Sequence, residues 1–148
     1  RVAPVSVDFE DWEWNPPYLR CSKTNAHSRL KELEESYIQN AILRLRFSDK
    51  LAKKIYGPGK VFKHVLLLHL SPMTAKMLDR LLDAYQKEGV YWVSYHDALK
   101  EPAYSEDTSY IGTVGKTMLL QGMETRKLNF ADLTHPQTPK DWLKAQCD

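Results

Sequence analysis

The stretch from residue 61 to residue 95 constrains the fold of this chain more than any other part of its sequence. Its pattern predicts a strand over 61–69, a helix over 72–88 and a second strand over 90–95. A strand, a helix and a strand in this order form a βαβ unit, which requires parallel strands and a right-handed crossover. The sequence therefore predicts an α/β fold.

Local signals mark the limits of these three elements. The apolar run Val65–Leu68 has the length and character of a strand that is buried on both faces. Ser71 suits the N-cap of the helix and Pro72 its first turn, because the serine oxygen accepts free backbone N–H groups and proline has none to leave unpaired. Gly89 can adopt the left-handed conformation that ends a helix.

The other segments are less regular. Residues 4–9 alternate between apolar and polar types, which predicts a strand that leads into a polar, aromatic loop. Residues 28–56 have apolar side chains at a period near 3.6, which predicts one long helix or two successive helices. After Pro102 the pattern weakens, and only short helical turns are expected, over 117–123 and 140–146.

Composition narrows the class of protein. A chain of 148 residues with 43% hydrophobic residues can bury one ordinary core. The 21 basic and 19 acidic side chains are spread along the chain, so we expect no nucleic-acid partner. No apolar run is long enough to span a membrane, and the two cysteines, Cys21 and Cys147, make no disulfide framework and no metal-binding Cys-x-x-Cys pair. The redox compartment stays open.

Candidate functional side chains lie where two predicted strands end. The first is followed by Asp8, Glu10, Asp11 and Trp12, and the second ends at His69. Because the carboxyl ends of parallel strands open onto one rim, we expect this acidic cluster and the histidine to lie close together. A carboxylate beside an imidazole stabilises its protonated form, which can donate a proton during catalysis.

Each of these residues also has a simpler interpretation. A histidine at a strand end is more often a polar loop residue or a hydrogen-bonded core residue than a catalyst. The acidic cluster is also typical of a solvated turn, and Trp12 and Trp14 suit either a core or a wall against which a sugar stacks. None of the five histidines has the spacing of a helical metal site, and no nucleotide-binding or serine-hydrolase motif is present.

Two motifs in this order are similar to those of a known enzyme family. Asp8-Phe9-Glu10-Asp11-Trp12 has the form D-x-x-D-W, and Leu66-Leu67-Leu68-His69 is an apolar strand that ends in histidine. Together they resemble the last two motifs of polysaccharide deacetylases of the NodB-homology type, carbohydrate esterase family 4. The resemblance continues through Gly89 to His96-Asp97-Ala98-Leu99 and covers about two thirds of the chain.

The resemblance implies that the chain is the carboxy-terminal portion of a distorted (β/α)7 barrel. The implied reaction is metal-dependent hydrolysis of acetyl groups, bound as amide or ester, from sugars, so the implied partner is an acetylated oligo- or polysaccharide. Carried over to this sequence, His69 is the general acid and Asp11 its partner, while Trp12 and Leu67 contact the substrate.

Three other family motifs do not occur. T-F-D-D supplies the base and one metal ligand, H-S/T-x-x-H supplies two histidine ligands, and a third motif carries an arginine and a proline; all of them precede D-x-x-D-W in the family. We therefore expect residues 1–107 to be the carboxy-terminal part of a deacetylase-like domain and 108–148 an extension. The missing amino-terminal part would bind the divalent metal, commonly zinc, leaving no metal ligand and no activity in this chain alone. Most members of the family are periplasmic, envelope or secreted proteins.

Two alternatives stay open. The chain fits a non-catalytic α/β module that binds a glycan or a protein through its aromatic residues, Trp12, Trp14, Tyr18 and Trp92. It also fits a small metabolic α/β protein in which the motifs occur by chance, because short motifs often mislead.

Overall fold

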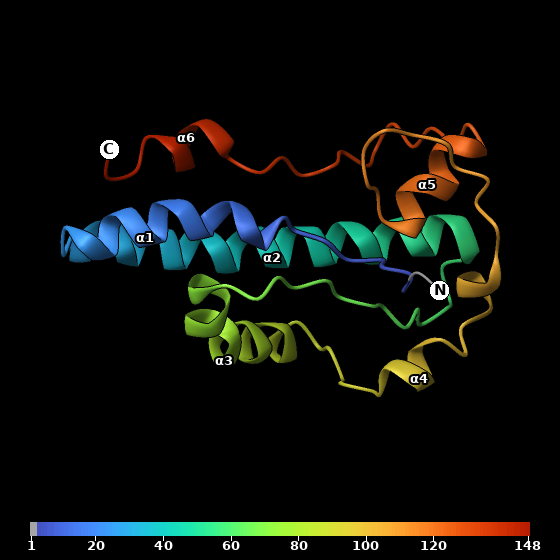
Figure 1. Ribbon diagram of the computed structural model, residues 1–148. Helices are drawn as coiled ribbons and strands as arrows, with labels where there is room; N and C mark the ends of the chain where they lie inside the picture. Colours follow the sequence, from blue (N-terminus) through green and yellow to red (C-terminus); the bar gives the residue numbers. More distant parts are fainter. Residues whose placement is uncertain (1–2) are drawn as a thin grey trace. The chain divides into compact units, whose positions relative to one another are not determined.

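The computed structural model describes residues 3–148, and helices account for 55% of the chain (Figure 1). The helical elements are η1 (Asp11–Trp14), α1 (Asn15–Lys23), α2 (His27–Tyr56), α3 (Pro72–Lys87), α4 (Tyr95–Ala98), η2 (Pro102–Ser105), α5 (Met118–Thr125) and α6 (Lys140–Lys144), of which η1 and η2 are 3-10 helices.

The predicted α/β fold, a portion of a (β/α)7 barrel, is wrong. Residues 3–148 contain no sheet and no barrel, and their β-structure is one isolated parallel bridge between Val7 and Leu66. At this bridge the Val7 N–H donates to the Val65 carbonyl and the Leu67 N–H donates to the Val7 carbonyl, each at 3.0 Å. The two segments are therefore paired in the predicted parallel sense, but the pairing does not extend into a ladder.

The remaining strand predictions fail because strands need neighbouring backbone to satisfy their N–H and C=O groups. Tyr91, within the predicted strand 90–95, has 90% of its surface exposed, and Val93 has 53%. The run Val65–Leu68 is half-buried and not enclosed on both faces. A sequence that favours the extended conformation stays without a sheet when no partner strand lies beside it.

The chain divides into two compact units. Unit 1 contains the segment that ends at Asp8, Leu45–Leu67 and Trp92–His135, and unit 2 contains Phe9–Arg44, Leu68–Tyr91 and Pro136–Asp148. Both units are discontinuous in sequence, so each depends on contacts between distant segments.

The two long helices form as predicted. The N-cap Ser71 accepts the Thr74 N–H through its side-chain oxygen at 3.1 Å, and Gly89, just beyond the end of α3, has a φ of 85°. Leu81 and Tyr85 of α3 are buried, whereas Leu78 is 39% exposed. Two methionines, Met73 and Met77, complete the buried face.

Unit 2 is built around an aromatic cluster. The side chains of Phe9, Trp14 and Tyr37 are fully buried, and the ring of Tyr37 meets those of Phe9 and Trp14 edge-on at centroid distances of 5.0 and 5.9 Å. The Trp14 indole N–H donates to Ser36 at 3.3 Å, and the Asn40 amide donates to the Phe9 carbonyl at 2.9 Å. These bonds join the segment before α1 to the middle of α2.

The segment after Phe9, predicted as a loop, is helical. η1 leads directly into α1, whose first turn contains Pro16 and Pro17. Proline is tolerated there because the first turn of a helix needs no backbone N–H donors. A disulfide joins Cys21 of α1 to Cys147, a pairing that the sequence analysis did not anticipate.

Unit 1 has an apolar core and a buried polar network. Ser6 is fully buried, and its hydroxyl lies 3.2 Å from His64 Nδ1 and 2.9 Å from the Tyr104 hydroxyl, which donates to the Lys63 carbonyl at 2.8 Å. Burial lowers the pKa of His64 to about 4 and outweighs the opposing effect of Asp49, while Lys53 adds a smaller effect in the same direction as burial. The core beside this network contains Phe47, Leu51, Ala52, Phe62, Ala103, Met118 and Leu119.

The neutral, buried His64 predicts a loss of stability in acid. Its pKa lies below the ordinary value of 6.5, so between that value and about 4 the unfolded chain binds a proton that the folded chain does not. The free energy of unfolding should fall by about 2–3 kcal/mol between pH 7 and pH 4.5, as measured by urea unfolding. His64→Gln should lose most of this dependence, whereas His27→Gln, at an exposed position, should keep it. An unchanged pH profile in His64→Gln would contradict the assignment.

Candidate functional site

The structure brings together Asp11 and His69, the two side chains that the sequence analysis assigned to catalysis. Asp11 is the first residue of η1, and His69 lies just before Ser71, the N-cap of α3. His69 Nδ1 lies 2.7 Å from Asp11 Oδ1, and the His69 backbone N–H donates to Asp11 Oδ2 at 2.9 Å. One carboxylate therefore fixes both the ring and the backbone of the histidine.

Asp11 is a buried charge that is held by hydrogen bonds. Its exposure is 0%, and Oδ2 also accepts the Thr74 hydroxyl at 2.8 Å. The Ser71 hydroxyl lies 2.9 Å from Thr74 Oγ1, so the N-cap of α3 supports the donor to Asp11. Burying a carboxylate without partners costs several kcal/mol, and each hydrogen bond to a charged group returns about 1.5–3 kcal/mol.

The pairing determines which nitrogen of His69 can face a substrate. A carboxylate only accepts hydrogen bonds, so Nδ1 carries the proton that joins it to Asp11. The other ring nitrogen, Nε2, is left for chemistry, and the His69 side chain is 44% exposed. Nε2 is therefore the atom available for proton transfer, and Asp11 fixes the ring through Nδ1.

Tyr37 lies beside the buried carboxylate and stays neutral. Burial, to which the charge of Asp11 adds, raises the pKa of Tyr37 to about 12, although the nearby Thr74 side chain opposes this change. The phenol therefore adds no second negative charge to the interior of unit 2.

Trp12 is accessible, whereas Leu67 belongs to a different unit. The Trp12 side chain is 45% exposed, and the Lys140 ammonium lies 5.7 Å from the centroid of its ring. Leu67 is half-buried in unit 1, where it lines a cavity. Of the two predicted substrate contacts, Trp12 therefore lies in the same unit as Asp11, whereas Leu67 lines a cavity of unit 1.

Glu10, next to Asp11, is held by side chains that the sequence analysis did not single out. Its carboxylate accepts hydrogen bonds from Arg44 at 3.2 Å, from Lys140 at 3.0 Å and from the Thr138 hydroxyl. Burial opposes ionisation of Glu10, but these donors outweigh it and lower the pKa of the carboxyl. No local pattern could have predicted these contacts, because Thr138 and Lys140 lie at the far end of the sequence.

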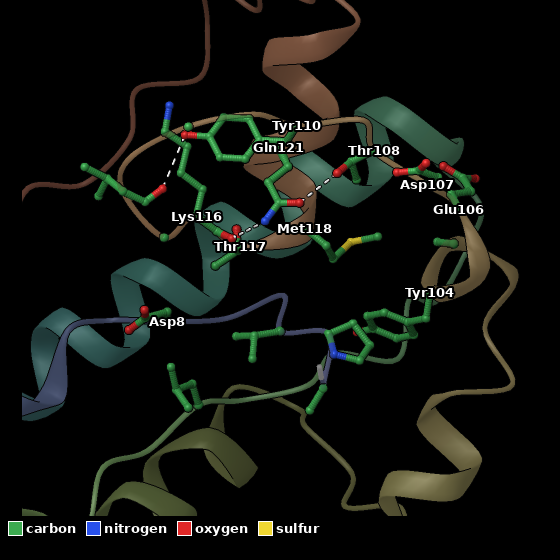
Figure 2. Close-up of a pocket in the computed structure, with 18 of the residues that line it drawn as sticks. Asp8, Tyr104, Glu106, Asp107, Thr108, Tyr110, Lys116, Thr117, Met118 and Gln121 are labelled. Carbon is green, nitrogen blue, oxygen red and sulfur yellow. Dashed lines mark hydrogen bonds between the residues drawn. The ribbon is translucent and has the colours of Figure 1, made fainter. Parts of the chain in front are cut away.

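Unit 1 contains a separate cavity of about 630 Å³ (Figure 2). Tyr104 and Tyr110 are among the residues that line it. The Tyr110 ring packs closely against Gly112, where a Cβ would lie 2.0 Å from the Tyr110 hydroxyl. Two other lining residues are joined by a hydrogen bond, which the Thr108 hydroxyl donates to the Gln121 side-chain oxygen at 2.7 Å (Figure 2). The carboxylates of Asp8, Glu106 and Asp107 also line the cavity.

Within residues 3–148, no three side chains of histidine, cysteine, aspartate or glutamate are grouped so that they could hold a cation. The pair formed by Asp11 and His69 has a geometry suited to proton transfer. The same part of the chain has no helix with the length and apolar character that crossing a membrane requires.

Comparisons of the chain with protein-family models, with curated proteins and with solved structures found no match.

The contact between Asp11 and His69 predicts the effect of Asp11→Asn. The two donors at Oδ2, the His69 backbone and Thr74, should retain the amide oxygen, so the amide NH2 will face Nδ1. Nδ1 must then accept, and the proton of the neutral ring moves to Nε2. Imidazole ¹⁵N chemical shifts should report this change of tautomer. Asp83→Asn, which removes the same charge from the exposed surface of α3, should leave the tautomer unchanged; a variant Asp11→Asn that keeps the wild-type shifts would refute the pairing.

Proposed function

We propose that this chain is part of a metal-dependent carbohydrate deacetylase, in which His69 is the general acid and Asp11 holds it. The observation that supports the proposal is the 2.7 Å contact between His69 Nδ1 and the fully buried Asp11 carboxylate. The two residues are also those that the resemblance to the deacetylase family assigns to the proton-donating step. A buried carboxylate behind a half-exposed imidazole is an arrangement suited to general acid–base catalysis.

The proposed step is transfer of one proton. Protonated His69 donates from Nε2 to the leaving amine nitrogen of an amide, or to the leaving oxygen of an ester, as its bond to the acetyl carbon breaks. Before the transfer, the ionised Asp11 stabilises the imidazolium. After it, the ring is neutral and keeps the proton on Nδ1, which stays hydrogen-bonded to Asp11. Trp12 offers an exposed aromatic face to the acetylated sugar.

The other parts of the reaction are assigned to residues outside this chain. The resemblance implies that a base and a divalent cation, commonly zinc, are supplied upstream of Arg1, so this chain alone is expected to be inactive. An extracytoplasmic location, periplasmic, envelope or secreted, is part of the same proposal. The disulfide between Cys21 and Cys147 supports it, because disulfides persist in oxidising compartments.

Turnover of acetylated oligosaccharides by the complete enzyme tests the role of His69. His69→Ala should lower kcat by roughly 10²–10⁴-fold, the usual contribution of a general acid, and should leave the bound metal content unchanged. Acetate release and metal analysis measure the two effects. His27→Ala, an exposed histidine in the same unit, is the matched control and should keep full activity. Wild-type turnover in His69→Ala would eliminate the proposed role.

A second candidate function is glycan binding without catalysis, and the cavity of unit 1 favours it. Its volume of about 630 Å³ lies within the range of small-ligand sites, and phenol and carboxylate groups line it. The aromatic residues first considered for this function do not form one accessible set, because Trp14 is fully buried. Trp12 and Trp92 are each 45% exposed.

Titration of this chain with acetylated oligosaccharides, followed by NMR, tests the second candidate. Binding at the cavity should weaken by roughly fivefold in Tyr110→Ala, because an aromatic contact to a ligand contributes about 1 kcal/mol. Tyr91→Ala, which removes an exposed phenol outside the cavity, should bind as the wild type does. Binding that is unaffected by Tyr110→Ala would exclude this cavity as the site.

A further inference from the structure

The last residues of the chain, 136–148, form a segment of unit 2 that carries α6 (Figure 1); we call it the strap. We propose that the strap positions the pair of Asp11 and His69, and that Thr138 and Lys140 act as positioning residues through Glu10. The functional meaning of this inference rests on the proposed role of His69, but the structural claim concerns the geometry of the pair itself.

Glu10 has a backbone conformation that needs support. Its φ of 56° and ψ of 42° lie in the left-handed region, a backbone conformation that residues other than glycine and asparagine rarely adopt. The next residue is Asp11, so the turn at Glu10 sets the direction in which the chain enters η1 and delivers the buried carboxylate. A residue held in this conformation persists only when its surroundings fix it.

The strap supplies much of that support. Thr138 is buried, accepts a hydrogen bond from Arg44 at 3.1 Å and donates its own proton to Glu10 Oε2. Lys140 Nζ lies 3.0 Å from Glu10 Oε1 and 2.9 Å from Glu13 Oε1, so one ammonium contacts carboxylates on both sides of Asp11. Arg44 also contacts Glu10 Oε2, at 3.2 Å. Both carboxylate oxygens of Glu10 thus contact the strap.

The far end of the strap is anchored to α1. Arg20 donates to the carbonyls of Leu143, Lys144 and Gln146, at the end of α6 and just beyond it, at 3.2, 2.8 and 2.9 Å. The disulfide fixes the strap to α1 at Cys21. Anchored at this end, the strap lies with Thr138 and Lys140 in contact with Glu10.

The spectroscopic signature of the pair tests the proposal in the chain as it exists. In the double variant Thr138→Val with Lys140→Met, Glu10 loses both strap contacts and its turn should relax. The Nδ1–H proton of His69 should then exchange with solvent roughly tenfold faster or disappear, because its charge-assisted bond to Asp11 is no longer held in place. The paired conservative variant, Thr138→Ser with Lys140→Arg, should restore the signal.

Two further measurements keep the result interpretable. Lys53→Met removes an exposed lysine and its 2.6 Å ion pair with Asp49 in unit 1, and should leave the His69 signal as in the wild type. If the double variant does not fold, Lys140→Met alone, at a side chain that is 46% exposed, should give a smaller change in the same direction. A wild-type His69 signal in the folded variant would overturn the proposal, and activity of the complete enzyme does not enter this test.

Discussion

The organisation of unit 2 depends on one buried charge, the carboxylate of Asp11. It accepts hydrogen bonds from the backbone and the ring of His69 and from the hydroxyl of Thr74, while its own exposure is 0%. A carboxylate in the interior tolerates little displacement, because losing one donor costs more than the hydrogen bond itself contributed. The start of α3 and the segment before it must therefore keep a fixed position relative to η1.

The packing around the carboxylate strengthens the same contacts. The rings of Phe9, Trp14 and Tyr37 lie in the core of unit 2, and electrostatic interactions are stronger where water is excluded. The stabilising network and the proposed catalytic pair thus share one group. A substitution at Asp11 changes both stability and chemistry, so the His69 tautomer separates these two effects better than activity alone.

The sequence predicts the helices better than the strands, for a physical reason. The capping at Ser71 and the apolar period of residues 28–56 are local, and α3 and α2 form where those signals place them. A strand depends on a neighbour that the sequence does not specify, so residues 90–95 have strand-forming side chains and no strand. Asp11 and His69 lie together although the predicted parallel sheet is reduced to one bridge, because that prediction required only proximity of two segments.

The contacts of the carboxy-terminal residues could not be predicted because they join the two ends of the chain. Lys140 and Glu10 are 130 residues apart, and Cys21 and Cys147 are 126 apart. Closing so long a loop has a large entropic cost, which the disulfide removes from folding by restraining the unfolded chain. Glu10 lies outside this loop, but the disulfide ties α1, which follows η1, to the segment that carries Lys140, and so brings the two ends of the chain together. This restraint favours the contacts between Glu10 and the strap, which the turn needs because its left-handed backbone has little intrinsic stability and its carboxylate lies between Arg44 and the strap.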